Sequence, residues 1–318
     1  MHPRLRVILA AVTVAALALP ITSARAVGPV ETVVSFDLSA GELPEGLAVD
    51  RRDNVYVSLI APVSDIRKIT PSGEQSTLVH FDVGGFGPLG LTVDAAGTVY
   101  AAVASMDPAS QGVYRVTANG TASRLAGTEA IAFPNDLTFD HKGNLFVTDT
   151  AGGAVWRIPR GGTAELWVDD PLLQGTGELG VGVPLGANGI AHHRNALVVA
   201  NTEGARLLRI PILPDGTAGE VGVMVEDPAI FGVDGIALDV RGSVYAAVNA
   251  QNAIVRADGG GFTTIADADD GINGVSAVAF GTGMGDRRSL FAVNFGVFSP
   301  APTPALLKVE VGVPGAPE

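Results

Sequence analysis

Short apolar stretches alternate with short polar turns along most of the chain. Residues 134–147, PNDLTFDHKGNLFV, are typical: LTF and LFV have the apolar and β-branched character of strands, and the polar residues between them form a turn. A third stretch, AVWRIP, alternates basic and apolar residues, and a weaker fourth, AELWVD, follows. The pattern predicts a unit of four short antiparallel strands.

This unit recurs along the chain. Its first two strands are repeated as PEGLAVDRRDNVYV at 44–57, PLGLTVDAAGTVYA at 88–101, ANGIAHHRNALVV at 187–199, VDGIALDVRGSVYA at 233–246, and more weakly from Val275. Four strands on a period of roughly 42–53 residues are the signature of a propeller blade. We therefore expect an all-β fold, a six-bladed β-propeller with four antiparallel strands per blade. A two-domain β-sandwich fits the even spacing poorly.

The last repeat supplies only three strands, ending in ALLKVEV, while ETVVSFDL near the amino terminus belongs to no repeat. We expect this N-terminal strand to complete the sixth blade and close the ring, which removes exposed sheet edges. The propeller would then span residues 27–318.

The first 26 residues have the features of a secretory signal peptide. Arg4 and Arg6 precede an apolar run from Val7 to Leu19, and Ala24-Arg25-Ala26 offers the small residues of a cleavage site. The run is short for a membrane span, although an uncleaved anchor is the alternative. We expect a secreted protein, extracellular or periplasmic, with no membrane contact after cleavage.

Composition narrows the possible partners and chemistry. The chain has 318 residues with 41 Gly and 20 Pro, which suits many turns and short strands. The formal net charge is −13, and residues 1–26 hold three Arg and no acid, so the remainder stands at −16. Such an acidic surface disfavours nucleic acid and anionic membranes as partners. With no cysteine, disulfides, a thiolate nucleophile and a zinc–cysteine site are excluded.

Polar residues recur where the first strand of each repeat starts. In a propeller these strands line the central channel, so blade symmetry would bring their first residues together. The six positions are Glu45, Leu89, Asn135, Asn188, Asp234 and Ser276. Two carboxylates and two amides make a hard-oxygen set that suits Ca²⁺, with Mg²⁺ as another possibility, whereas zinc would be expected to recruit nitrogen or sulfur. Alternatively these residues only cap strand starts, where turn residues are common.

The motifs PEGLAVD, PNDLTFD, GANGIA and GVDGIALD resemble those of the regucalcin/gluconolactonase family and, more distantly, of diisopropylfluorophosphatase and paraoxonase. The resemblance covers nearly all of residues 29–311. It implies a six-bladed propeller that holds a divalent cation, usually calcium, and hydrolyses lactones or organophosphates. It also implies cation ligands at Glu45, Asn135, Asn188 and Asp234, with Asp234 as catalytic base or nucleophile.

Other polar positions surround this predicted site. Asp149, Asn201 and Asn294 end second strands, and Asp136 stands where most repeats have glycine. They are candidates for orienting the ligands or contacting substrate, or they only cap strand ends. The Gly-rich segment 171–187 is a candidate mobile lid, and 104–111 a second loop at the same mouth, although both are alternatively plain connections.

The positions of the histidines indicate no role for them at this predicted cation site. His141, His192 and His193 fall at or beside turns at the opposite end of the channel, and His80 near the end of an outer strand. A paraoxonase-like histidine dyad is therefore not expected. No GxSxG or P-loop motif occurs, and GTGMGD at 281–286 departs from the dinucleotide-binding pattern.

Two main functions follow. The first is a secreted, Ca²⁺-dependent hydrolase acting on a small lactone, ester or phosphotriester, monomeric because a closed ring needs no partner. The second is a non-enzymatic propeller with a structural calcium that binds a protein or a glycan, since fold alone does not determine function. A lyase or synthase on the same fold is a third, less favoured option.

Overall fold

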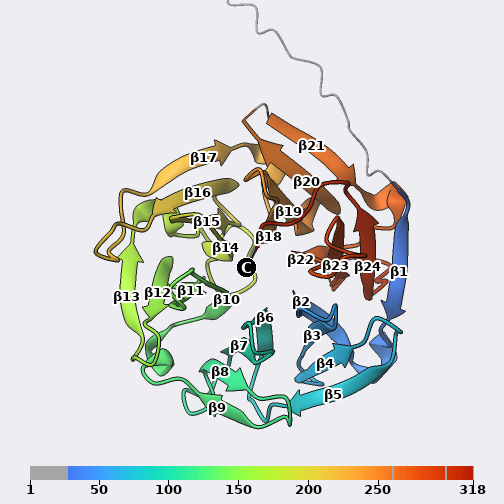
Figure 1. The fold of residues 1–318 in the computed structure, drawn as a ribbon, viewed down its shortest axis with the longest axis horizontal. Helices are drawn as coiled ribbons and strands as arrows, with labels where there is room; N and C mark the ends of the chain where they lie inside the picture. Colours follow the sequence, from blue (N-terminus) through green and yellow to red (C-terminus); the bar gives the residue numbers. More distant parts are fainter. Residues whose placement is uncertain (1–27, 260, 298, 318) are drawn as a thin grey trace, which may run out of the picture.

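The computed structural model describes residues 28–259, 261–297 and 299–317, which form six sheets radiating from a central channel (Figure 1). In each sheet the strand nearest the axis pairs with the next strand in sequence. The predicted all-β, six-bladed propeller is confirmed. No helix among the described residues is long and apolar enough to cross a membrane. The predicted signal peptide, residues 1–26, lies outside the described residues.

The blades follow one another in chain order. Blade 1 contains β2 (Leu43–Val49), β3 (Val55–Ile60), β4 (Asp65–Ile69) and β5 (Gln75–His80). Blade 2 contains β6 (Gly87–Val93), β7 (Val99–Ala104), β8 (Gly112–Val116) and β9 (Ala122–Arg124). Blade 3 contains β10 (Pro134–Phe139), β11 (Leu145–Asp149), β12 (Ala154–Ile158) and β13 (Glu165–Asp169).

The second half repeats the arrangement. Blade 4 contains β14 (Ala187–His193), β15 (Ala196–Asn201), β16 (Arg206–Pro211) and β17 (Gly222–Glu226). Blade 5 contains β18 (Val233–Leu238), β19 (Val244–Val248), β20 (Ala253–Asp258) and β21 (Gly261–Ala266). Blade 6 contains β22 (Val275–Phe280), β23 (Ser289–Asn294), β24 (Ala305–Glu310) and β1 (Val30–Ser35). Short 3-10 helices lie in the connections: η1 (Leu38–Ala40), η2 (Thr128–Ala130), η3 (Pro171–Leu173), η4 (Pro228–Ile230), η5 (Asn249–Gln251) and η6 (Ala268–Asp270).

The first described strand closes the ring, as predicted. β1 runs antiparallel to β24, with Val30 opposite Val309. Val34 of β1 is buried in the core between blades 6 and 1, in the same cluster as Leu59 and Phe291. The sixth blade is thereby assembled from both ends of the chain, and the edge of β24 is covered.

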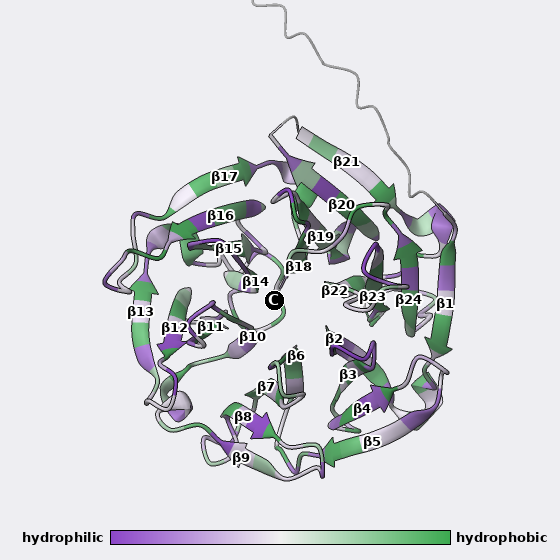
Figure 2. Cartoon of the chain, in the orientation of Figure 1, coloured by the Kyte–Doolittle hydropathy of each residue, from purple (hydrophilic) through white to green (hydrophobic). Residues whose placement is uncertain are grey.

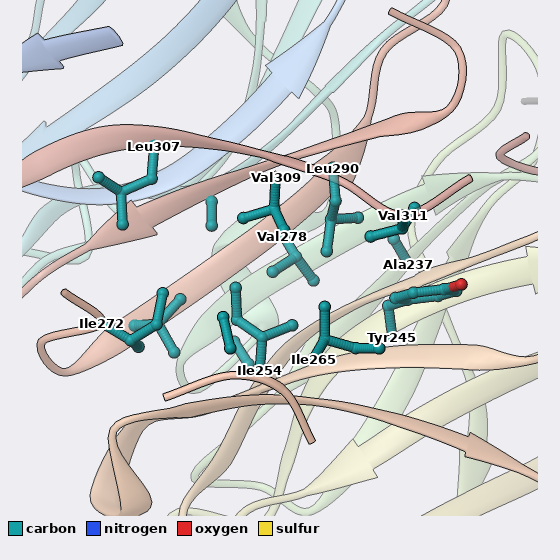
Figure 3. Close-up of a cluster of buried hydrophobic side chains, with 14 of the residues drawn as sticks. Ala237, Tyr245, Ile254, Ile265, Ile272, Val278, Leu290, Leu307, Val309 and Val311 are labelled. Carbon is teal, nitrogen blue, oxygen red and sulfur yellow. The ribbon is translucent and has the colours of Figure 1, made fainter. Parts of the chain in front are cut away.

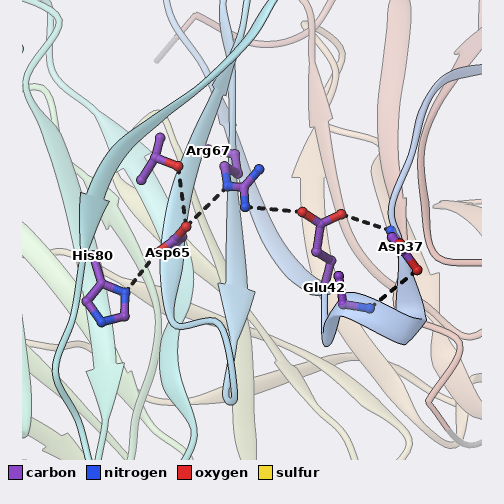
Figure 4. Close-up of polar contacts among 7 residues, drawn as sticks. Asp37, Glu42, Asp65, Arg67 and His80 are labelled. Atoms are coloured by element: carbon purple, nitrogen blue, oxygen red, sulfur yellow. Dashed lines mark hydrogen bonds and ion pairs between the residues drawn. The ribbon is translucent and has the colours of Figure 1, made fainter.

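Polar contacts fasten the connection from β1 to blade 1 (Figure 4). Glu42 accepts a hydrogen bond from the Asp37 backbone N–H at 2.8 Å and forms an ion pair with Arg67 at 3.1 Å. Asp65 lies between the Arg67 guanidinium, at 3.2 Å, and His80 Nδ1, at 2.9 Å. His80 is therefore engaged within blade 1, on its outer strand β5.

The hydrophobic core is divided among the six junctions between blades. Between blades 5 and 6, the rings of Tyr245 and Phe280 meet edge to face at 5.1 Å. Tyr245, Ile254, Leu290 and Val309 belong to one buried cluster at this junction (Figure 3). Hydrophobic residues run along the strands of every blade and alternate with hydrophilic ones on the outer strands (Figure 2). Because both faces of the inner strands are covered, burial of apolar area holds neighbouring blades together.

The turn between the first two strands is held by an aspartate. Asp140 Oδ1 accepts hydrogen bonds from the backbone N–H groups of Lys142, at 2.8 Å, and Asn144, at 2.9 Å. The same pattern occurs at Asp50, Asp94 and Asp239. This side chain mimics a backbone turn, which explains the recurrent aspartate in the repeat.

The chain end returns to the axis at this turn side (Figure 1). The Ala316 N–H donates to the Leu238 carbonyl at 2.8 Å, and the Gly315 N–H to the Arg287 carbonyl at 3.0 Å. The segment after β24 therefore joins blade 6 to blade 5 across the turn end of the channel.

Ring closure can be tested with two neighbouring valines of β1. Val34 is 7% exposed and Val33 is 37% exposed. Val34→Asp places a carboxylate in the junction core and should lower the free energy of unfolding by about 3 kcal/mol. Val33→Asp, the matched control, should change it by less than about 0.5 kcal/mol. Equal chemical-denaturation midpoints for the two variants would contradict the closure described above.

Candidate functional site

A β-bulge lies at the start of every inner strand. The register shifts between Pro44 and Leu47 in β2, between Ala187 and Ile190 in β14, and at the equivalent place in the other four inner strands. A bulge takes residues out of the hydrogen-bonded ladder and re-aims their side chains. The six positions picked out by the repeat all fall in these bulges: Glu45, Leu89, Asn135, Asn188, Asp234 and Ser276.

The bulges of neighbouring blades approach each other closely. A Cβ on Gly189 would lie 2.3 Å from the Asp234 carbonyl oxygen, which is too close for any residue but glycine. Gly46, Gly90 and Gly235 make equivalent close approaches. Ser276 Oγ donates to the Glu45 carbonyl at 2.6 Å and so joins the last blade to the first. The strand starts therefore form a tight ring around the axis.

The four predicted cation ligands share one space. A cavity of about 1320 Å³ occupies the channel, and Glu45, Asn135, Asn188 and Asp234 all line it. We call these four side chains the oxygen ring. In blade 2 the equivalent residue is Leu89, which is only 4% exposed. At this level of the channel, blades 1, 3, 4 and 5 therefore carry a carboxylate or an amide. Blade 6 carries Ser276, and blade 2 carries an apolar residue.

Acidic side chains in this space raise one another's pKa. Burial raises the pKa of Glu45 well above its usual range, and the charges of Asp234 and Asp136 raise it further. Burial, reinforced by Asp136, raises the pKa of Asp234 to about 8, while hydrogen bonds with Asn188 and Asn249 act in the opposite direction. Carboxylates that are half-buried and close to other carboxylates are stabilised in their ionised form by a cation among them.

Asp136 ties blade 3 to blade 4. Its carboxylate accepts hydrogen bonds from the Ile190 N–H across the junction, at 3.0 Å, and from the Leu137 N–H, at 2.9 Å. Its own N–H donates to Thr148 Oγ1 at 3.0 Å. A Cβ on Gly90 would lie 2.5 Å from Asp136 Oδ1, so glycine in blade 2 leaves room for this carboxylate. Asp136 thus joins two blades and adds negative charge beside the oxygen ring.

Two residues that the repeat pattern did not single out contact the oxygen ring. Thr202 Oγ1 accepts a hydrogen bond from Asn188 Nδ2 at 2.9 Å, and the Asn249 side chain is hydrogen-bonded to Asp234. Each directly follows the last residue of a second strand, Asn201 in β15 and Val248 in β19. Successive residues of a strand point to opposite sides. The residues that contact the oxygen ring are therefore those one position after the strand ends, and not the strand ends themselves.

The polar residues that end the second strands, Asp149, Asn201 and Asn294, form hydrogen bonds with backbone groups. The Asp149 carboxylate accepts hydrogen bonds from the N–H groups of Ala132 and Phe133, both at 2.9 Å, just before β10. Asn201 and Asn294 bind the backbone of the equivalent connections before β14 and β22. All three side chains therefore position the segments that lead into the inner strands.

The Gly-rich connection 171–187 is fastened by one carboxylate. Glu203 accepts backbone hydrogen bonds from Thr176, Gly177, Leu179 and Leu185 at 2.6–3.1 Å. Although burial opposes it, these four bonds hold the pKa of Glu203 below its usual range. At neutral pH the anion is therefore fixed in place, and much of this connection is wrapped around it.

His141 and His192 line the same cavity from its other end. Their rings meet edge to face at 4.5 Å. Burial, with a contribution from the charge of His141, lowers the pKa of His192. His141 lies in the β10–β11 turn and His192 lies near the end of β14. Both are therefore where inner strands end, whereas the oxygen ring lies where those strands start.

The donor set of the oxygen ring fits a hard divalent cation. Two carboxylates and two amide oxygens are ligands that Ca²⁺ prefers, and Mg²⁺ also takes oxygen donors. Within the described parts of the chain, no three His, Cys, Asp or Glu side chains lie close enough to bind a metal by themselves. The amide oxygens of Asn135 and Asn188 are therefore required to complete such a site.

The fold and this ring define the chain as a six-bladed propeller of four-stranded blades with acidic and amide groups at the channel axis. Its structural neighbours include gluconolactonases and regucalcin. A gluconolactonase from Xanthomonas campestris superposes with a TM-score of 0.68 at 17% identity, over 93% of this chain and 94% of its own. The calcium-binding protein regucalcin from Agrobacterium tumefaciens gives 0.66 at 17% identity, over 92% and 97%.

A lyase is also among the structural neighbours. Virginiamycin B lyase from Staphylococcus aureus gives a TM-score of 0.58 at 17% identity, over 84% of this chain and 82% of its own. No protein-family model and no curated protein matches the sequence. At this level of identity the likeness shows a shared fold, and function has to be argued from the site.

The raised pKa of Asp234 gives the cation-free protein a testable pH dependence. A carboxyl whose folded pKa lies near 8 binds a proton that the unfolded chain releases near 4, so stability falls as pH rises between these values. In chelator, the melting temperature should therefore fall from pH 5 to pH 9, and Asp234→Asn should flatten this fall. Asp269→Asn, an exposed control, should leave it unchanged. Parallel curves for wild type and Asp234→Asn would contradict the raised pKa of this group.

Proposed function

We propose that this protein is a secreted, Ca²⁺-dependent hydrolase of small lactones. The observation that carries the proposal is the oxygen ring, in which four blades each direct one carboxylate or amide into the same space. The raised pKa values of Glu45 and Asp234 support a cation there. The gluconolactonase and regucalcin neighbours support a lactone as the small-molecule substrate. In this proposal the protein acts as a monomer.

The oxygen ring would hold the cation, which supplies Lewis-acid polarisation of the lactone carbonyl when bound. Asp234 accepts a proton from a water molecule whose oxygen attacks the carbonyl carbon. The ring C–O bond then breaks, and the same proton passes to the leaving oxygen, giving a hydroxy acid. The alternative is direct attack by the Asp234 carboxylate, which breaks the ring C–O bond and forms an anhydride. The leaving oxygen takes a proton from a water molecule, and the hydroxide so formed hydrolyses the anhydride to the hydroxy acid and the free Asp234 carboxylate.

The neighbours of Asp234 orient it for either route. Asn188 and Asn249 hydrogen-bond its carboxylate, and both bonds favour the ionised form that acts as base or nucleophile. Thr202 fixes the Asn188 amide through Nδ2 and so leaves Oδ1 available for the cation. Asp136 holds blade 4 in register with blade 3, which keeps Asn135 and Asn188 at a fixed separation.

A lactone panel tests this function. Hydrolysis should require Ca²⁺, stop in EDTA and recover when Ca²⁺ is added back. Asp234→Asn should lower kcat about 10²-fold or more, as expected for loss of a general base or nucleophile. Asp269→Asn is the control and should retain full activity. Hydrolysis that persists both in EDTA and in Asp234→Asn would refute the proposal.

The other functions give distinct outcomes. A calcium-stabilised protein without turnover on lactones or phosphotriesters would be a binding propeller. Cleavage without uptake of water, detected by mass spectrometry of the products, would indicate a lyase, as one structural neighbour is named.

Export is a separate part of the proposal. Cleavage after Ala26 should yield a mature chain that begins at Val27 and is recovered outside the cytoplasm. N-terminal sequencing of protein recovered from the producing organism checks it. A chain that keeps residues 1–26 and stays in the cytoplasm would contradict it.

A further inference from the structure

Three apolar side chains gather on blades 2 and 3 at the end of the channel where the inner strands start. Phe86 precedes β6 and Phe133 precedes β10, and their rings meet edge to face at 5.1 Å. Met106 follows β7 and lies over Gly85, whose added Cβ would be 3.1 Å from Met106 Cγ. Phe86 is 40% exposed and Met106 is 80% exposed. We call Phe86, Phe133 and Met106 the apolar rim.

The apolar rim is close in sequence to Leu89, the apolar residue in the bulge of blade 2. Phe133 stands two residues before Asn135, and Phe86 stands three residues before Leu89. Backbone hydrogen bonds fix both segments, because the carbonyls of Phe86 and Phe133 accept N–H groups from adjacent connections at 2.8 and 3.0 Å. The apolar rim is therefore fixed just before the bulges of blades 2 and 3, and in the blade 2 bulge the apolar Leu89 takes the place of a carboxylate or amide.

The polar side chains of these connections make hydrogen bonds within the connections themselves. Gln111 donates to the Ile131 carbonyl, beneath the segment that carries Phe133. The hydroxyls of Ser105 and Ser110 bond each other at 2.8 Å. Asp107 accepts the backbone N–H of residue 109 at 2.9 Å. The side chains of Phe86, Phe133 and Met106 offer no hydrogen-bond partner, so a hydroxyl group lying against them would lose a hydrogen bond to water, which costs affinity.

We infer that the apolar rim binds an apolar substituent of the substrate, so the preferred substrates are lactones that carry an alkyl chain rather than polyhydroxylated sugar lactones. This inference rests on the proposed function and specifies its substrate class. The lactone carbonyl faces the polar sector, formed by blades 1, 3, 4 and 5. The alkyl chain extends over Leu89 to Phe86 and Met106, where burial of each methylene should raise kcat/KM roughly fourfold.

Chain length provides the test. The wild type should hydrolyse γ-nonalactone with a kcat/KM at least tenfold above that for γ-valerolactone, and both should exceed D-glucono-1,5-lactone. Phe86→Ala and Met106→Ala should each remove most of this tenfold gain and leave γ-valerolactone unchanged. Melting temperatures of the variants identify any loss of folding, and exposure of both side chains makes such loss small.

A second exposed methionine gives a matched control. Met284 is 96% exposed and lies between β22 and β23, at the opposite end of the channel. Met284→Ala should behave as wild type on every lactone. Preference for the sugar lactone, an equal loss on all substrates in the rim variants, or a chain-length effect in Met284→Ala would each overturn the inference.

Failure of the proposed function is separable from failure of this inference. No hydrolysis of any lactone with Ca²⁺ present would refute the lactonase function. Binding of a non-hydrolysed γ-hexyl pyrrolidinone, measured by calorimetry, then decides the apolar rim alone. Binding should weaken about tenfold in Phe86→Ala and not in Met284→Ala. Equal affinity for both variants and wild type would overturn the role of the rim.

Discussion

The close approach of six inner strands at one axis is the constraint on which the rest of the structure depends. A Cβ on Gly189 would lie only 2.3 Å from the Asp234 carbonyl oxygen. The backbones of neighbouring blades are therefore in direct contact around the axis. Bulges at the same level take the preceding residues out of the ladder and turn them to the axis. Burial of apolar surface between the blades maintains this arrangement, because each strand start is fixed by the packing of the sheet behind it.

One consequence of this constraint is that several carboxyl groups are held close together. Side chains that are remote in sequence, Glu45 and Asp234, share a space with Asp136, and burial together with mutual repulsion raises the pKa values of the first two. Such an arrangement is unfavourable without a positive charge and favourable with a hard cation. The surrounding polar residues are used differently: Asp149 and Glu203 bind backbone N–H groups and so hold the connections that frame the ring.

The sequence predicted the blades well because each blade is a local repeat. The alternation of apolar residues, the Asp turn and the spare N-terminal strand are all visible in the chain, and the six sheets and the β1–β24 pairing agree with them. Segment 171–187 was harder to interpret. Its glycines indicate a mobile loop, yet the carboxylate that holds it, Glu203, lies beyond the next two strands and carries no sign of that role in the sequence.

The sequence by itself therefore determined the architecture and the identity of the ring positions, since a repeat states which residues are equivalent. Only the tertiary structure decided which neighbours act on them. Thr202 reaches Asn188 and Asn249 reaches Asp234 because hairpin register places one residue, and not the one before it, on the channel side. The same applies to Phe86 and Phe133, whose rings meet only because two adjacent blades bring their connections together. Such contacts between blades depend on distances in space, which a pattern along the chain does not contain.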